Sequence, residues 1–270
     1  MRIDSYNNKK MPPKKELQKT ELPLMLTISK VTHEAKDHKT LFFNHKLDVK
    51  PGQFIKLWIP GVDSKPFAVS FHKKDSFAVT FQIIGKFTKA LSKIKAGDIV
   101  GLFGPYGNSF SAKKNAVVVG GGCGIASLSN LIDRLKNPVI INGARSKDYI
   151  LFRNRYKSAV IATDDGSSGK KAFATDILKE LMQKRKYSIV YTCGPEIMMK
   201  KVLDICNKYK VNCEASLERY MSCGFGICGK CAINDKLVCK DGPVFNSKQL
   251  SKMTEFGNFH RLKSGRKVKF

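Results

Sequence analysis

The hydrophobic pattern of this chain changes its period once, near Lys114, and that change constrains the fold more than any other feature. Before it, short apolar runs alternate with polar residues. Phe77, Val79 and Phe81 fall two residues apart, which is the period of a strand with one buried face. Turn-forming pairs such as Pro51-Gly52 separate these runs. The pattern predicts about six strands in a small antiparallel β-barrel.

After the change, strand-like runs alternate with helical segments. The runs are "NAVVVG", "PVIING", "SAVIAT" and "YSIVYTCG". After the last of these runs, Met198, Val202, Ile205 and Tyr209 follow one another at spacings of four and three, which mark the apolar face of a helix. Alternating strands and helices predict a parallel sheet with helices on both faces, a fold that commonly binds nucleotides.

These patterns divide the chain into a barrel, an α/β domain and a short cysteine-rich domain, with basic segments at both ends. Hydrophobic residues make up 42% of the chain and charged residues 26%, as in globular proteins. No apolar run is long enough to cross a membrane and no secretory signal is visible, so we expect a cytoplasmic protein with no membrane partner. The expected parts are a disordered basic arm (1–20), the barrel (21–112), the α/β domain (113–214), the cysteine-rich domain (215–250) and a basic tail (251–270), loose or used for docking.

The net charge of +27 makes nucleic-acid binding an alternative to consider. Away from the two ends, however, the basic residues are mostly single lysines or pairs between apolar positions, and there is no arginine-rich helix or aromatic RNA-binding signature. The charge therefore predicts a solvated, lysine-rich surface, and we expect no nucleic-acid partner.

Four cysteines lie close together in the cysteine-rich segment. Cys223, Cys228 and Cys231 have the spacing C-x4-C-x2-C, and Cys239 follows after seven more residues, which is the plant-type [2Fe-2S] pattern. Intervening glycines allow one loop to direct several thiolates at one inorganic core. A structural zinc ion is the main alternative, although a zinc ribbon usually has two C-x2-C pairs and this segment has one. Disulfides are the weaker alternative in a cytosolic chain.

Three predicted strands of the α/β region end in glycine-rich or polar segments. "VVVGGGCGIAS" contains Gly120, Gly121, Gly122 and Gly124 where a strand turns into a helix, the geometry that brings backbone N–H groups to a pyrophosphate. Alone this string is weak, because it is not G-x-G-x-x-G and a tight structural turn would look similar. "ATDDGSSG" and "YTCGPE" end two further strands, and three such ends predict one ligand-binding crevice.

Within the barrel, "SKPFAVS" and "IIGKFTKAL" are unusual for simple connections. A Lys-Pro-aromatic strand start and a Gly-x-x-Thr helix start fit the ring and the pyrophosphate of a flavin. As isolated strings they are more often a turn and a helix cap.

Barrel, nucleotide domain and iron-sulfur loop, in this order, resemble the ferredoxin-reductase superfamily. The ending "LERYMSCGFGICGKCAI…LVCKDGPVF" resembles the electron-transfer subunits of NAD-dependent dihydroorotate dehydrogenases, and the similarity covers roughly residues 22–250. The Arg-Pro-x-Ser-like flavin motif of the superfamily corresponds to Lys65–Ala68, where lysine replaces arginine and alanine replaces serine. Lysine still meets phosphate as a point charge, whereas Ala68 offers no side-chain hydroxyl.

The resemblance implies three cofactors and their binding residues. FAD would be bound by Lys65, Pro66, Phe67, Ala68, Thr80, Phe81, Gln82, Gly85, Phe87 and Thr88. NAD would be bound by Gly120, Gly121, Gly122, Gly124, Arg145, Asp164, Asp165, Cys193, Gly194 and Pro195. A [2Fe-2S] cluster would be bound by Cys223, Cys228, Cys231 and Cys239.

The resemblance also implies an activity. A separate FMN-containing catalytic subunit would oxidise dihydroorotate in de novo pyrimidine (UMP) biosynthesis, and electrons would pass through [2Fe-2S] and FAD to NAD+ in a heterotetramer with two of each subunit. Hydride transfer between flavin and nicotinamide needs no acid-base group, so no catalytic residue is expected. The alternatives are an NAD(P)H diaphorase subunit of a cytosolic hydrogenase or sulfur reductase and, from another class, a zinc-ribbon nucleic-acid-binding protein.

Overall fold

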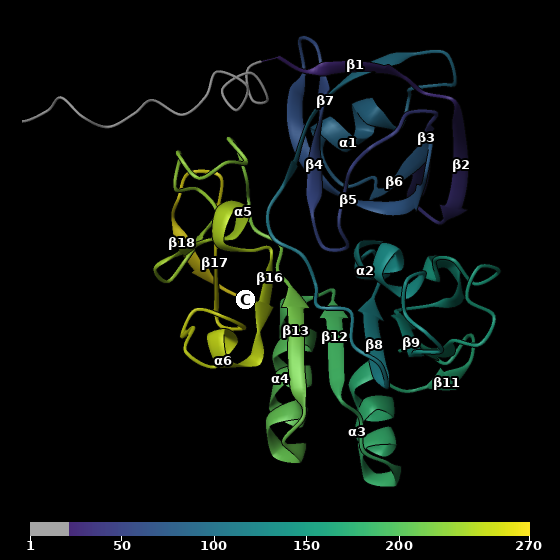
Figure 1. The fold of residues 1–270 in the computed structure, drawn as a ribbon, viewed down its shortest axis with the longest axis vertical. Coiled ribbons are helices and arrows are strands. Elements are labelled where there is room, and N and C mark those ends of the chain that lie inside the picture. The colour runs from purple at the N-terminus through teal and green to yellow at the C-terminus, as the bar shows by residue number, and fades with distance from the viewer. Residues whose placement is uncertain (1–21) are drawn as a thin grey trace, which may run out of the picture.

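The computed structural model describes residues 22–270, so the predicted arm at 1–20 lies outside the described residues. Figure 1 shows an upper barrel, a lower α/β domain and a C-terminal part beside both. None of the helices within residues 22–270 has the length and apolar character needed to cross a membrane.

The barrel is one antiparallel sheet in the order β1-β7-β4-β5-β6-β3-β2. Its apolar core includes Leu41, Phe77 and Val79, as the period of two requires. One short helix, α1 (Lys86–Leu91), follows β6. The strands are β1 (Leu24–Thr27), β2 (Lys30–Ala35), β3 (His38–Phe43), β4 (Phe54–Ile59), β5 (Asp63–Lys73), β6 (Ser76–Gln82) and β7 (Ile99–Tyr106).

The α/β domain is a second sheet in the order β11-β10-β9-β8-β12-β13-β16, parallel except where β16 joins β13. The helices are α2 (Gly124–Ile132), α3 (Ala174–Lys184) and α4 (Glu196–Tyr209). The strands are β8 (Ala116–Gly121), β9 (Val139–Ala144), β10 (Val160–Thr163), β11 (Lys170–Lys171), β12 (Ile189–Cys193), β13 (Asn212–Ser216) and β16 (Val244–Asn246).

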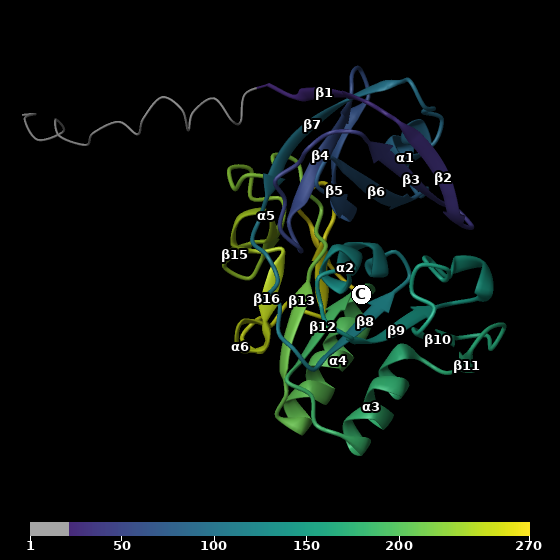
Figure 2. The ribbon, with the colours of Figure 1, turned by 45° about the vertical axis from the view of Figure 1, so that its right-hand side comes forward.

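Helices cover both faces of this sheet, as predicted. On β8, Val117 and Val119 pack into the core that contains α3 and α4, whereas Val118 packs into the core that contains α2. Helix α2 lies between the sheet and the barrel (Figure 2), where Ser129 Oγ donates a hydrogen bond to the carbonyl oxygen of Ser70 in β5 at 2.5 Å. The carboxyl ends of the central strands therefore face the barrel across α2.

The cysteine-rich segment has little core of its own, as expected, and shares the core of the α/β domain. Met221, Ile233 and Phe245 pack into the same cluster as Val202 of α4. The remaining elements of this region are β14 (Ala232–Ile233), β15 (Lys236–Leu237), α5 (Val238–Asp241) and α6 (Ser247–Leu250).

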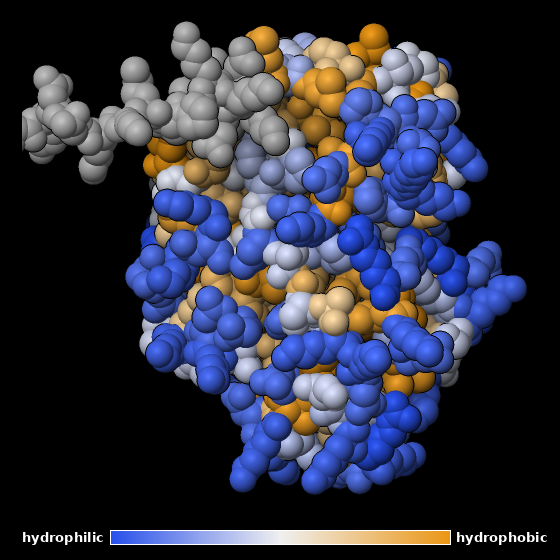
Figure 3. All heavy atoms as spheres, in the orientation of Figure 1, coloured by the Kyte–Doolittle hydropathy of each residue, from blue (hydrophilic) through white to orange (hydrophobic). Residues whose placement is uncertain are grey.

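The last twenty residues differ from the expected loose tail. Strands β17 (Phe259–Arg261) and β18 (Lys267–Lys269) form an antiparallel hairpin. Glu255 anchors it, because its Oε1 lies 2.7 Å from Lys267 Nζ and 3.3 Å from Arg261 Nη2. Two of the basic side chains of the predicted tail, Arg261 and Lys267, thus form ion pairs within the protein. Elsewhere, on the face drawn in Figure 3, hydrophilic residues are distributed over all parts of the molecule, as the scattered lysines predict.

Candidate functional site

A cavity of about 540 Å³ lies between the barrel, α2 and residues 216–221, and we call it the barrel cavity. Strands β5 and β6 and the start of α1 form one wall, while Ala126 and Ser127 of α2 lie across from them. Every residue predicted to bind FAD lines it: Lys65, Pro66, Phe67, Ala68, Thr80, Phe81, Gln82, Gly85, Phe87 and Thr88. The two barrel strings that were weak separately therefore meet at one site.

Lys65 supplies a cation to this cavity. Its Nζ donates to Asp63 Oδ2 at 2.5 Å and lies 5.4 Å from the centre of the Tyr220 ring. Burial by itself would raise the pKa of Asp63, but hydrogen bonds from Lys65 and from the Ser64 backbone N–H outweigh it and hold that pKa below its usual value. Asp63 is therefore anionic at neutral pH and orients the lysine that would meet a flavin phosphate.

Other predicted flavin residues shape the cavity rather than offering free polar groups. Thr88 Oγ1 accepts hydrogen bonds from the backbone N–H groups of Ile84 and Gly85 at 2.9 and 3.0 Å, so it holds the turn into α1. Thr80 Oγ1 is bonded to the hydroxyls of Thr40 and Ser70 inside the barrel, both at 2.8 Å. Polar contacts to a flavin ring are therefore left to backbone groups and to neighbouring residues, as the alanine at position 68 suggested.

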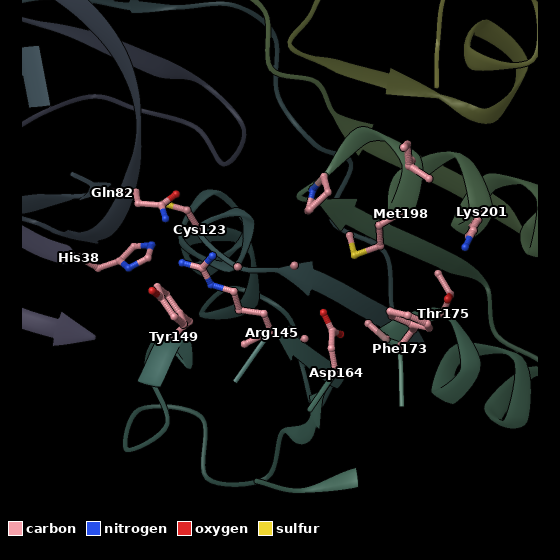
Figure 4. Close-up of a pocket in the computed structure, with 17 residues that line it drawn as sticks. His38, Gln82, Cys123, Arg145, Tyr149, Asp164, Phe173, Thr175, Met198 and Lys201 are labelled. Carbon is pink, nitrogen blue, oxygen red and sulfur yellow. The ribbon is translucent and has the colours of Figure 1, made fainter. Parts of the chain in front are cut away.

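A second cavity, of about 390 Å³, lies at the carboxyl ends of β8, β9 and β10, and we call it the nucleotide cavity (Figure 4). Of the residues predicted to bind NAD, Gly121, Gly122, Arg145, Asp164 and Pro195 line it. The Arg145 guanidinium lies over the Tyr149 ring at 3.7 Å from its centre, an arrangement that holds the cation at the cavity wall.

Three residues predicted to bind NAD line none of the three cavities described here. Asp165 Oδ1 accepts hydrogen bonds from the backbone N–H and the hydroxyl of Ser167 at 2.9 and 2.6 Å, so its carboxylate stabilises its own turn. Cys193 is fully buried, and burial raises the pKa of its thiol. Gly120 is a packing position, because a Cβ there would lie 2.6 Å from Ile125 Cδ1.

A third cavity, of about 530 Å³, shares lining residues with each of the other two. Gly124, Gly194 and Pro195 line it on one side, and the C-terminal hairpin lines it on the other through His260, Arg261 and Phe270. Gln82 and Cys123 line all three cavities, and Figure 4 shows their side chains next to each other. A ring system in the barrel cavity and a second ring from the nucleotide cavity would meet at this pair.

The cysteine loop follows directly on the wall of the barrel cavity. Tyr220 and Met221 line that cavity, and Cys223 comes two residues later. Gly224, with a φ of +89°, lets the loop turn back, and Cys228 is exposed at its outer side. The predicted ligand loop thus lies beside the predicted flavin site.

The four thiols are arranged as two pairs. Burial would raise the pKa of Cys223, but hydrogen bonds from the backbone N–H groups of Cys228, Phe225 and Ile227 and from the Cys228 side chain outweigh it and lower the pKa to about 6. Such N–H groups stabilise a thiolate and suit a metal ligand.

The second pair is buried. Cys231 and Cys239 are each 2% exposed, and the backbone N–H of Cys239 donates to Cys231 Sγ at 3.4 Å. Burial and the neighbouring Cys231 thiol raise the pKa of Cys239 to about 12 in the absence of a metal. Within residues 22–270 no three His, Cys, Asp or Glu side chains converge on one metal position. Two neighbouring pairs of thiols suit the two iron ions of a [2Fe-2S] centre.

Several lining residues had not been predicted. Tyr220 and Met221 in the barrel cavity belong to "LERYMSC", from which only the cysteine was predicted to bind a cofactor. His38, Tyr149 and Phe173 in the nucleotide cavity come from three separate segments. Phe173 is 58% exposed, a large apolar side chain suited to stacking on a flat ring, but no sequence pattern singles it out.

The comparisons with known proteins agree with this site. Residues 218–251 match the family described as the iron-sulfur cluster binding domain of dihydroorotate dehydrogenase B. A solved structure described as an NADH-dependent reduced ferredoxin-NADP oxidoreductase aligns with a TM-score of 0.77 at 29% identity, covering 87% of this chain and 93% of that one. Phthalate dioxygenase reductase shares the fold at a TM-score of 0.61 and 18% identity, covering 74% of this chain and 70% of that one.

Two curated relatives cover nearly the whole chain. Both are described as probable dihydroorotate dehydrogenase B (NAD(+)), electron transfer subunit. The Methanocaldococcus jannaschii protein is 43% identical over 92% of this chain and 99% of its own length. The Pyrococcus horikoshii protein is 45% identical over 89% and 96%. With this similarity over most of both lengths, the chain belongs to the family of dihydroorotate dehydrogenase B electron transfer subunits.

Proposed function

We propose that this chain carries electrons from a dihydroorotate dehydrogenase catalytic subunit to NAD+. The observation that supports this most directly is the continuity of the site: the cysteine loop follows Met221 on the barrel cavity, and that cavity meets the nucleotide-side cavities at Gln82 and Cys123. One path thus joins a one-electron centre, a flavin position and a nicotinamide position.

Each part of the path has a role. FAD bound in the barrel cavity would supply both hydride exchange with nicotinamide and single-electron exchange with an iron-sulfur centre. Lys65 binds a flavin phosphate, and the glycines of the β8–α2 turn allow the dinucleotide to approach the backbone. Arg145 and Asp164 stand at the wall of the nucleotide cavity. Hydride transfer requires the protein only to position the flavin and nicotinamide rings, so no acid-base residue is assigned.

The exposed side of the cysteine loop is the proposed docking face for the FMN-containing catalytic subunit. Phe225 and Ile227, on either side of Gly226 and just before Cys228, are 45% and 79% exposed. Large apolar side chains gathered around an exposed ligand indicate a surface that a partner covers. We propose a cytoplasmic heterotetramer with two copies of each subunit, acting in pyrimidine biosynthesis.

The diaphorase alternative differs in the partner and not in the relay. The similarity to an NADH-dependent reduced ferredoxin-NADP oxidoreductase keeps that alternative open to test. The zinc-ribbon alternative is disfavoured by the family to which the chain belongs.

Anaerobic purification with co-purifying proteins tests the proposal. We expect FAD, iron and sulfide, a rhombic [2Fe-2S] EPR signal after reduction, and dihydroorotate-dependent reduction of NAD+ by the complex. Cys228→Ser is expected to remove the signal, whereas Cys206→Ala, in the buried core of α4, serves as the matched control that keeps it. A colourless protein that contains zinc, or a complex without dihydroorotate activity, would contradict the proposal.

A further inference from the structure

Lys56 is a buried lysine with an unusual set of partners. It lies in β4 and is 7% exposed, although lysine is rarely buried without a charged partner. Its Nζ donates to the carbonyl oxygens of Ser222 and Cys223 at 2.5 and 3.1 Å. Among residues 22–270 no carboxylate forms a salt bridge with it. Burying an unpaired ammonium costs free energy, so this position calls for a compensating negative charge.

The cysteine loop is shaped around this side chain. A Cβ on Gly224 would lie 2.8 Å from Lys56 Cδ, so only a glycine lets the loop backbone approach the lysine stem this closely. The ring of Phe103 lies on another side, with its centre 5.8 Å from Nζ. Lys56 also pairs across the sheet with Pro66, which lines the barrel cavity. The ammonium therefore contacts the start of the cysteine loop, next to a strand that lines the barrel cavity.

The negative charge that this ammonium lacks is available in the loop itself. Cys223, whose carbonyl binds Nζ, also supplies the first of the four thiols. Four thiolates outweigh the positive charge of an oxidised [2Fe-2S] core, and reduction adds one electron and no atom, so the reduced site is more anionic still. A buried cation stabilises the more anionic form more strongly, because little water screens it.

We propose that Lys56 is a positioning residue that raises the reduction potential of the [2Fe-2S] cluster, by holding a buried positive charge against the loop that binds it. The inference rests on the proposed function, since it requires the cluster. Lys56, a residue of the barrel, would thus help to set the reduction potential of the cluster, because charge, hydrogen bonding and burial tune such centres.

The test is a potentiometric titration of the anaerobically purified complex, with the reduced cluster measured by EPR. Two neutral variants are compared with the unsubstituted protein: Lys56→Met keeps much of the apolar stem, and Lys56→Gln keeps a hydrogen-bond donor. Both are expected to lower the reduced-to-oxidised ratio at a fixed potential by about tenfold, which corresponds to about 59 mV for one electron. Lys56→Arg is expected to keep the potential near that of the unsubstituted protein.

Lys240→Met is the matched control. Lys240 lies against the same loop, where a Cβ on Gly226 would meet its side chain at 2.8 Å, but it is exposed and its charge is screened by water. An equal shift in Lys240→Met would overturn the proposal. A change of less than about twofold in the reduced-to-oxidised ratio of both neutral Lys56 variants would overturn it as well. Loss of the cluster from both neutral variants would also overturn it, since Lys56 would then serve to hold the loop. Iron missing from the unsubstituted protein would instead contradict the proposed function.

Discussion

The buried ion pair between Arg219 and Glu196 ties the cysteine-rich segment to the α/β domain. The side chains are 3% and 5% exposed, and the guanidinium meets the carboxylate through both Nη atoms, with Nη2 2.7 Å from Oε1. Glu196 begins α4 and also accepts the backbone N–H of Gly257 at 2.9 Å. Arg219→Met would leave this carboxylate buried with only that neutral donor.

Breaking one side of a buried, hydrogen-bonded pair costs about 3–5 kcal/mol of stability. For a chain of this size we expect the melting temperature to fall by roughly 6–20 °C. Thermal unfolding followed by circular dichroism measures the fall. Because Arg219 also lines the barrel cavity, the measurement is made with and without added FAD.

Two further variants separate the buried charge from lost packing. Arg219→Met combined with Glu196→Met removes both charges, and we expect it to recover most of the loss, since a well-packed apolar pair replaces a buried ion pair at little cost. Lys170→Met breaks an exposed pair with Glu180, which is worth about 0–1 kcal/mol. The reasoning is refuted if Arg219→Met lowers the melting temperature no more than Lys170→Met.

Three other substitutions follow from the cavities. Asp164→Ser removes from the nucleotide cavity a carboxylate that would repel the extra phosphate of NADPH. The ratio of the dissociation constants of NADPH and NADH should therefore fall by about tenfold. An unchanged ratio would show that this carboxylate does not repel the phosphate. Lys65→Met should weaken FAD binding by about tenfold or more in a fluorescence titration, and equal affinity would exclude a phosphate contact. Gly124→Ala places a Cβ 2.2 Å from the Cys193 carbonyl oxygen and should lower the melting temperature, whereas Gly85→Ala meets open space and should change it by only about 1–2 °C; similar values for the two would contradict the packing argument.

Much of the architecture could be predicted because it depends on local patterns. The period of two over Phe77–Ile83 corresponds to β6, and the glycine-rich turn after "NAVVVG" separates β8 from α2. One boundary was less visible: "LMLTISKV", predicted as one strand, contains all of β1 and the start of β2. The backbone N–H of Ile28 still bonds the Asp98 carbonyl oxygen beside β7, whereas that of Ser29 bonds the Phe42 carbonyl oxygen in β3. An apolar run shows that a segment is buried but not where it changes partners.

The sequence alone determined the kind of chemistry, because cysteine spacing, alternating strands and glycine-rich turns are properties of neighbouring residues. Only the tertiary structure decided which groups meet. Asp164 and Asp165 are adjacent and chemically alike, yet only Asp164 lines the nucleotide cavity. Lys56 and Cys223 lie far apart in sequence and come into contact only because the cysteine loop folds onto the barrel. Such contacts depend on the paths of distant backbone segments, which no local pattern encodes.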